Sequence, residues 1–106
     1  MGAPLALFVY GISDCAPCAV VKAALEDRAG LNFEVRIAGI DEIRSLRKQY
    51  GRKLVYPTIV LRSGDRELGR REGARSAEPA DERRLIIDWI QGVRGNLRFR
   101  SEEGRA

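Results

Sequence analysis

The sequence contains no histidine and only two cysteines among its 106 residues. Without histidine, the chain cannot carry out catalysis with a Ser–His or Cys–His pair of its own. Two cysteines also fall short of the four cysteine and histidine ligands that a structural zinc site takes from one chain. We therefore expect the chemistry of the chain to rest on Cys15 and Cys18, which two residues separate.

Long apolar runs are also missing, because none approaches the roughly 20 residues that a membrane-spanning helix requires. The first apolar run, Leu5–Tyr10, has no basic region before it and no secretory cleavage pattern after it. We therefore expect no signal peptide and no membrane partner, and we expect the protein to be cytoplasmic.

Aromatic residues make up only 7% of a chain that has 19 Lys and Arg against 15 Asp and Glu. The basic residues between Arg44 and Lys53 have Asp41 and Glu42 close by, and those of the stretch 62–72 are interleaved with acidic residues. Such mixing favours a solvated, salt-bridged surface. A nucleic-acid surface is the alternative, but the scarcity of aromatic residues weakens it, and we expect no nucleic-acid partner.

Apolar periodicity predicts seven elements in the order β-α-β-α-β-β-α. We expect strands over residues 5–11, 32–38, 58–61 and 67–72, and helices from Pro17 to about Gly30, from Asp41 to Tyr50 and from residue 80 or 81 to Gly95. The fold class is α/β, with one mixed sheet and helices on both of its faces. The first three strands are expected to be joined by parallel crossovers, and the last two to form an antiparallel hairpin.

Single residues are expected to mark the ends and the buried faces of these elements. Gly30 should cap the first helix, Asp41 should be the N-cap of the second, and Gly51 should stop it. The inward-facing residues should be Phe33, Val35 and Ile37 in the second strand, Ile43, Leu46 and Tyr50 in the second helix, and Leu85, Ile86, Trp89, Ile90 and Val93 in the last helix.

The length of the chain favours a single domain. We place this domain at residues 1–95. Beyond Gly95 the chain is mostly Arg, Glu, Gly and Ser, so residues 96–106 are expected to form a flexible C-terminal tail.

Cys15 and Cys18 lie where the first strand ends and the first helix begins. The N–H groups and positive dipole end at a helix N-terminus stabilise an anion, and the thiolate is the reactive form of cysteine. A redox-active dithiol is therefore the favoured interpretation of the Cys-x-x-Cys motif. Two alternatives remain: a buried structural pair, and half of a zinc or iron–sulfur site shared between two chains.

Pro57 begins the third predicted strand, between Tyr56 and Thr58, at one of the few places where a strand tolerates proline. If the Tyr56–Pro57 bond is cis, the ring and the turned backbone are expected beside the dithiol. The Tyr56 backbone would then pair with an extended substrate. An ordinary trans proline is the alternative, since only about 5–6% of X–Pro bonds are cis.

The motif Cys15-Ala16-Pro17-Cys18, the triplet Tyr56-Pro57-Thr58 and the order of elements together resemble the thioredoxin superfamily, over roughly residues 5–92. The resemblance implies a thioredoxin-like fold, with a central mixed four-stranded sheet flanked by three helices. It implies a cis proline that faces the dithiol, with Pro57 shaping the substrate groove. We expect Tyr56 and Thr58 to bind substrate beside Pro57, and an ordinary strand-edge aromatic is the alternative for Tyr56. It also implies that Cys15 attacks a disulfide and that Cys18 resolves the mixed disulfide.

Two branches of this superfamily are represented in the chain. The front half, Val9 to Cys15, resembles glutaredoxins, because thioredoxins usually have Trp in place of Asp14 and a buried acid in place of Val9. The back half resembles thioredoxins, which also place proline directly before the second cysteine. Glutaredoxins hold glutathione with a Gly-Gly and acidic pair, and the corresponding stretch 73–76, Gly-Ala-Arg-Ser, lacks it.

Two charged residues are expected to influence the thiolate. Asp14 is adjacent to Cys15, so its charge works against the thiolate and against the helix dipole. Lys22, one turn beyond Cys18, offsets this charge if its side chain folds back. The alternative for Lys22 is an ordinary solvent-facing position on the helix.

These features predict a thiol–disulfide oxidoreductase that uses the Cys15/Cys18 couple to reduce disulfides of protein or small-thiol partners. We expect a monomer without a bound cofactor, restored by a separate thiol reductant or reductase, with glutathione as one candidate reductant. One alternative is a thioredoxin-fold binding module whose cysteines hold a metal or iron–sulfur cluster between two chains. The other is a glutathione-dependent glutaredoxin.

Overall fold

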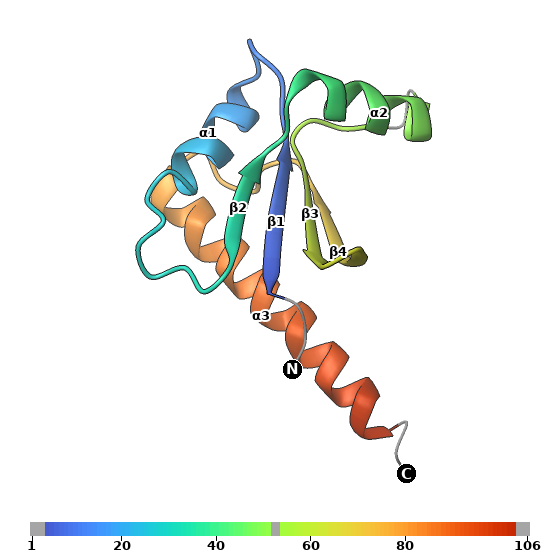
Figure 1. Cartoon of the computed structure of the whole chain (residues 1–106). Coiled ribbons are helices and arrows are strands. Elements are labelled where there is room, and N and C mark those ends of the chain that lie inside the picture. The colour runs from blue at the N-terminus through green and yellow to red at the C-terminus, as the bar shows by residue number, and fades with distance from the viewer. Residues whose placement is uncertain (1–3, 52–53, 104–106) are drawn as a thin grey trace.

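The computed structural model describes residues 4–51 and 54–103, and this part of the chain confirms the predicted order of elements (Figure 1). The elements are β1 (Leu5–Tyr10), α1 (Ala16–Ala24), β2 (Glu34–Ile37), α2 (Ile40–Tyr50), β3 (Thr58–Ser63), β4 (Arg66–Glu72) and α3 (Pro79–Glu103). The four strands form one mixed sheet in the order β2-β1-β3-β4, as the α/β prediction requires.

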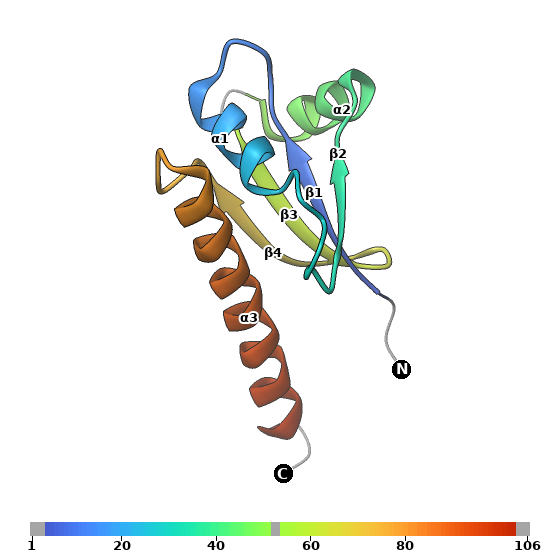
Figure 2. The ribbon, with the colours of Figure 1, turned by 90° about the vertical axis from the view of Figure 1, so that its left-hand side faces the viewer.

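The direction of β3 differs from the sequence prediction. β1 and β2 are parallel, but β3 runs antiparallel to β1 as well as to β4. The reason is the course of α2, which lies crosswise near the end of the sheet where β2 ends and β3 begins (Figures 1 and 2). A parallel crossover must return the chain to the opposite end of the sheet, and α2 does not do so.

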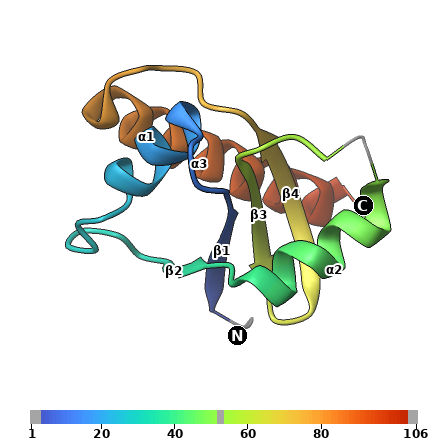
Figure 3. The same ribbon diagram turned by 90° about the horizontal axis from the view of Figure 1, so that it is seen from above.

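One face of the sheet is covered by α1 and α3, while α2 lies on the other face (Figure 3). The core between the sheet and helices α1 and α3 contains alternate residues of the central strands, because side chains of a strand point to opposite faces in turn. Ile86 and Ile90 of α3, which are four residues apart, face this core, as predicted. The buried members of this core are Leu7, Val9, Val21, Leu25, Ile59, Leu61, Ile86 and Ile90.

A second, smaller core lies beneath α2. Tyr10 and Val60 of the central strands pack there with Leu46 of α2, and the partly buried Ile43 and Tyr50 join them, as predicted. Arg70 of β4 donates a hydrogen bond to the Tyr50 hydroxyl, and its guanidinium lies 4.0 Å from the centre of the Tyr50 ring. The C-terminal end of α2 is thereby attached to the sheet.

Helix α1 ends earlier than predicted, at Ala24 with Leu25 as its C-cap, and Gly30 does not cap it. The cause is a tertiary contact. The guanidinium of Arg83 in α3 donates hydrogen bonds to the carbonyl oxygens of Ala24 at 3.0 Å and Ala29 at 2.9 Å, and also to that of Asp27. The Ala24 carbonyl is one that a continued helix would have used itself, and the bonds to Asp27 and Ala29 hold the chain after the helix against α3.

The N-cap of the second helix and the burial of the second strand also differ from the predictions. Helix α2 has Gly39 rather than Asp41 as its N-cap, and the Glu42 carboxylate accepts a hydrogen bond from the Gly39 N–H at 3.4 Å. Gly51 does stop the helix, with a φ of 62°. In β2, Ile37 is 45% exposed rather than buried, because β2 is an edge strand.

Helix α3 does not end at Gly95 but continues to Glu103 and extends beyond the sheet, so its backbone is helical where a tail was predicted (Figure 2). The stretch 96–103 has no proline and contains good helix formers such as Leu, Arg and Glu. The domain boundary at residue 95 stays a prediction, and residues 104–106 lie outside the described part. Among the described helices, none combines the length and the apolar character needed to cross a membrane.

The packing predicts a sharp difference between two isoleucines. Ile86→Ala removes a fully buried side chain, so we expect the free energy of unfolding to fall by about 2–5 kcal/mol. Ile40→Ala is the matched control, because Ile40 is 66% exposed, and we expect a change within about 0.5 kcal/mol. Urea denaturation followed by circular dichroism measures both, and equal losses would contradict the packing described here.

Candidate active site

The Cys-x-x-Cys pair begins α1, as the sequence predicted. Cys15 is the N-cap residue in extended conformation, and its Sγ accepts a hydrogen bond from the backbone N–H of Cys18 at 3.2 Å. The two cysteines form a disulfide, with their Cα atoms 5.2 Å apart. Sγ of Cys15 therefore occupies the position where a capping oxygen usually satisfies the helix N-terminus.

The two sulfur-bearing residues differ in their access to solvent. Cys15 is partly exposed, whereas Cys18 is only 1% exposed and lies in the first turn of α1. A partner molecule can thus reach Cys15 but not Cys18. The roles that the resemblance implied, with Cys15 attacking and Cys18 resolving, stay a prediction, and the difference in access is compatible with them.

Gly11 holds the buried end of the dithiol. A Cβ atom at Gly11 would lie 3.2 Å from the Cβ of Cys18 and 3.4 Å from its Sγ, so a larger residue would require Cys18 to shift by a few tenths of an ångström. The same position is 3.6 Å from Cε of Lys22. The exposed side chain of Lys22 therefore folds back along α1 toward the loop that carries the cysteines.

The Tyr56–Pro57 bond is cis, as the resemblance implied. Thr58 pairs with Tyr10 in the β1–β3 ladder, and continuing this register by one residue places Pro57 opposite Gly11. Because Gly11 contacts Cys18, the buried proline lies beside the dithiol.

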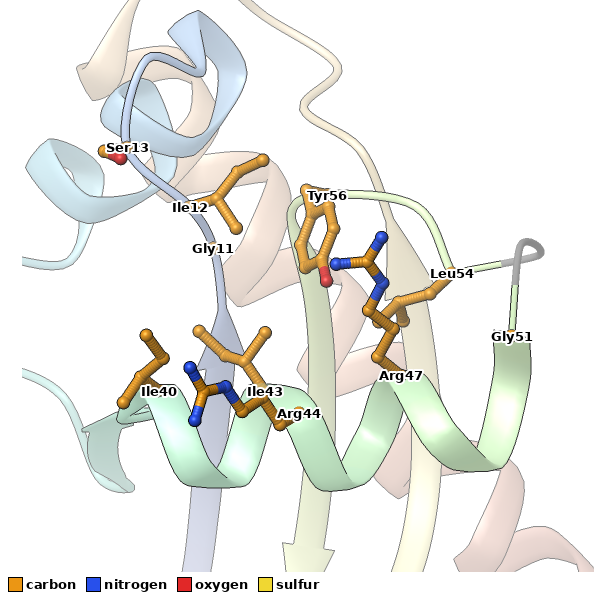
Figure 4. A pocket seen from close by; sticks show the side chains of 10 residues that line it. All are labelled: Gly11, Ile12, Ser13, Ile40, Ile43, Arg44, Arg47, Gly51, Leu54 and Tyr56. Carbon is orange, nitrogen blue, oxygen red and sulfur yellow. The ribbon is translucent and has the colours of Figure 1, made fainter.

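The three predicted substrate-binding residues differ in exposure. Tyr56 is partly buried and lines a groove, and Pro57 is buried (Figure 4). Thr58 is fully buried, and its hydroxyl donates a hydrogen bond to the Val55 carbonyl oxygen. The Thr58 side chain thus supports the loop from inside, while a direct contact of any of the three with substrate stays a prediction.

A second loop, 73–77, flanks the dithiol, and the sequence marks its residues 73–76 only as lacking the glutathione-binding pair of glutaredoxins. Together with Ala16, Pro17 and Val20 of α1, its residues line a hollow of about 330 Å³. The N–H of Gly73 donates a hydrogen bond of 2.8 Å to the Pro57 carbonyl oxygen. The loop therefore connects the proline to the first turn of α1.

A buried ion pair holds this loop in place. Arg71 of β4 and Glu82 of α3 are bonded twice, at 2.9 and 3.2 Å, and both side chains are fully buried. Glu82 also accepts a hydrogen bond from the backbone N–H of Arg75 at 3.1 Å, and Arg71 donates one to the Gly73 carbonyl oxygen at 3.4 Å. The pair thus fastens both ends of the turn that follows β4.

Sequence reasoning missed this pair, although a signal for it exists. Arg71 lies opposite Ile59 in the β3–β4 ladder, so its side chain shares the core face with Ile59. Glu82 precedes Ile86 and Ile90 at four-residue spacing, on the buried stripe of α3. An acid and a base at inward positions of neighbouring elements indicate a buried pair, but only once the register is known.

The remaining electrostatics around the dithiol are modest. Burial raises the pKa of Tyr10, the residue before Gly11, and the charge of Arg62 opposes this shift. Asp14 is exposed, with a left-handed φ of 55°, a conformation that Asp tolerates better than most residues. Val9 is fully buried in the apolar core, so the strand carries no acid beneath the cysteines, as predicted.

Within one chain, the described residues hold no cluster of metal ligands. Across residues 4–51 and 54–103, no group of three or more His, Cys, Asp or Glu side chains is placed to hold a metal ion. The arrangement consists of one accessible sulfur, one buried sulfur and two loops that shape the surface around them. Such a site can form, exchange and reform a disulfide.

Comparison with known proteins gives structural matches only. Neither a protein-family model nor a curated protein sequence matches the chain. A mutant thioredoxin from Halobacterium salinarum is 21% identical, with a TM-score of 0.64 over 86% of this chain and 75% of that one. Thioredoxin from Schistosoma mansoni is 16% identical, with a TM-score of 0.61 over 87% and 81%. Thioredoxin f from spinach chloroplasts is 18% identical, with a TM-score of 0.60 over 88% and 79%.

The buried ion pair generates a prediction about stability. Glu82→Ala leaves Arg71 charged and unpaired in the core, so we expect the free energy of unfolding to fall by about 3–5 kcal/mol. Asp81→Ala is the control, because its pair with Arg84 is exposed and is expected to contribute less than about 1 kcal/mol. The double variant Arg71→Met/Glu82→Leu should recover part of the loss in urea denaturation, because it removes the unpaired charge but not the need of the Gly73 and Arg75 backbone for partners. If Asp81→Ala proved as damaging as Glu82→Ala, the pair would not have the role assigned to it.

Proposed function

Because the chain has the thioredoxin-like fold and a disulfide between one accessible and one buried cysteine, we propose that it is a thiol–disulfide oxidoreductase. The observation that carries this proposal is the position of the pair, with Cys15 at the N-cap of α1 and Cys18 in its first turn. In the proposed direction, the reduced chain donates two electrons to a disulfide of a protein or a small-thiol partner.

The reaction proceeds in two exchanges. The Cys15 thiolate attacks one sulfur of the partner disulfide, a Cys15–partner bond forms, and the other partner sulfur leaves as a thiolate. Cys18 then loses its proton and attacks the Cys15 sulfur, so that the Cys15–Cys18 bond forms and the second partner sulfur leaves. In total, two electrons and two protons pass to the partner, and a separate thiol reductant must restore the dithiol.

The local structure supports the first exchange. A negative charge on Cys15 lies at the positive end of the α1 dipole and within hydrogen-bonding distance of the Cys18 N–H. Asp14 opposes this charge, whereas Lys22 is close enough to the loop to offset part of the opposition. The balance of these charges sets the fraction of Cys15 that is reactive.

The buried position of Cys18 supports the second exchange. Its Cα atom lies 5.2 Å from that of Cys15, and its side chain is packed against Gly11. Cys18 is therefore shielded from bulk thiols but already in reach of the Cys15 sulfur. A mixed disulfide on Cys15 is thus resolved within the chain rather than by a second molecule.

The partners of the proposed reaction are a protein with an accessible disulfide and a thiol reductant or reductase. We propose a cytoplasmic monomer that needs no bound cofactor, with glutathione as one candidate reductant. Loop 73–77 lacks the Gly-Gly and acidic pair of glutaredoxins, which favours a thioredoxin-like reductase as the electron source. Turnover with glutathione alone would favour the glutaredoxin alternative.

A redox titration of the pure protein tests the proposal directly. The state of Cys15 and Cys18 is read by mass after alkylation, and we expect one two-electron transition with a midpoint nearer to about −270 mV, typical of a reductant, than to about −120 mV, typical of an oxidant. Cys15→Ser and Cys18→Ser should both abolish the transition. If no intrachain disulfide forms in any oxidising buffer, the reduced protein should be examined for metal content and dimerisation, as the metal-sharing alternative requires.

The charges beside Cys15 generate a second prediction. Asp14→Asn should speed the alkylation of the reduced chain by iodoacetamide at neutral pH, because it removes a like charge from the thiolate. Lys22→Met should slow it, and each change should be at most about five-fold, as expected for one exposed charge worth about 1 kcal/mol. Glu26→Gln is the control, because Glu26 is exposed, lies just after the C-terminal end of α1 and does not line the hollow around Cys15. The charge model fails if Glu26→Gln changes the rate as much as Asp14→Asn does.

A further inference from the structure

A groove of about 760 Å³ lies between α2 and the loop that leads to the cysteines (Figure 4). We call it the α2 groove, and its lining includes Ile12, Ser13, Ile40, Arg44, Arg47 and Tyr56. Ser13 is two residues before Cys15, and Tyr56 directly precedes the buried Pro57. One end of the groove is therefore formed by the loop that leads to Cys15, and Ile12 and Ser13 also line the separate hollow around Cys15, although neither cysteine lines the groove.

Exposed apolar side chains gather at this groove. Among the described residues, four large apolar side chains are exposed, and two of them, Ile12 at 43% and Ile40 at 66%, line the groove. A third, Val55 at 44%, is next to Tyr56 in the chain. Apolar surface concentrated beside a reactive group indicates a place where a partner binds.

The same groove carries two arginines that have no acidic partner. Arg44 and Arg47 extend from α2 alongside the groove (Figure 4), and neither forms an ion pair with any residue in the described ranges. In contrast, Arg70 and Arg71 both have a carboxylate partner. Arg52 and Lys53, the last members of the basic cluster in the sequence, lie outside the described residues.

The groove is already formed in the free chain. Leu46, a residue of α2, is buried between this helix and the sheet, and the contact of Tyr50 with Arg70 attaches the end of the helix to β4. Hydrogen bonds to Glu67 and Tyr50 raise the pKa of Arg70 despite its burial, so the attachment keeps its positive charge. Little ordering of the backbone is then needed when a partner binds.

We propose that the α2 groove binds an extended segment of the disulfide partner in which acidic residues and an apolar residue flank the reacting cysteine. The carboxylates contact Arg44 and Arg47, and the apolar side chain packs against Ile12 and Ile40. This inference rests on the proposed oxidoreductase function and names the class of substrate for it. Unpaired guanidinium groups favour carboxylates, and the volume accommodates several side chains rather than one small thiol.

Two synthetic peptides test the charge preference. Each peptide contains one disulfide and an apolar residue. The reacting cysteine is flanked by Asp and Glu in one peptide and by Lys in the other. The value of kcat/KM for the reduction of each peptide is measured with the full chain. We expect the wild type to prefer the acidic peptide by about tenfold, and Arg44→Glu/Arg47→Glu to remove or reverse this preference. Arg66→Glu/Arg94→Glu changes the net charge by the same amount at exposed positions away from the groove, and should keep the preference.

The apolar contact is tested separately. Ile40→Ser should raise KM for the acidic peptide several-fold with kcat unchanged, and the exposure of Ile40 means that the fold tolerates the change. Reduction of a small neutral disulfide that does not extend along the groove should be unaffected by any of these substitutions.

The outcomes separate the two proposals. If the neutral disulfide is not reduced at all, the oxidoreductase proposal fails. If it is reduced but the two peptides react equally, or if Arg66→Glu/Arg94→Glu alters the preference as much as Arg44→Glu/Arg47→Glu, the groove proposal alone is overturned. A preference for glutathione disulfide over the acidic peptide that is lost in Arg44→Glu/Arg47→Glu would also overturn it, because the groove would then serve a small thiol.

Discussion

The antiparallel pairing of β1 with β3 is the constraint on which the site depends. Its register places Thr58 opposite Tyr10 and therefore Pro57 opposite Gly11. Gly11 in turn leaves room for Cys18. The pairing of β1 with β3 therefore determines which residues surround the Cys18 sulfur at the end of the sheet. A slip of one residue would exchange the two faces of β3 and move the proline away from the dithiol.

Cys15 is partly exposed and Cys18 is buried, and this difference is the basis for the different roles proposed for the two cysteines. Helix α1 presents Cys15 at its start, where solvent and the dipole reach the sulfur, and turns Cys18 inward against the sheet. Around them, the structure places an apolar groove with basic residues on the α2 side and a loop fixed by a buried ion pair on the other. In the proposed function, the chemistry of the cysteines and the selection of partners thus involve different residues.

The pair of Arg71 and Glu82 places two charges in the core beside the dithiol site. Removing two charges from water is unfavourable, and an apolar pair of similar size often gives equal or greater stability. Here the two side chains also bond the backbone of Gly73 and Arg75, which apolar side chains cannot do. The pair therefore specifies the path of the chain after β4, next to the hydrogen bond between Gly73 and Pro57.

The sequence by itself determined the order of elements, the inward stripes of α2 and α3, and the position of Cys15 and Cys18 at a strand–helix junction. These features follow from local periodicity and from the spacing of the two cysteines. Only the tertiary structure decided the direction of β3, the early end of α1 beneath Arg83, and the neighbours of each cysteine. The reason is that these features depend on contacts between residues far apart in the chain, which no local pattern records.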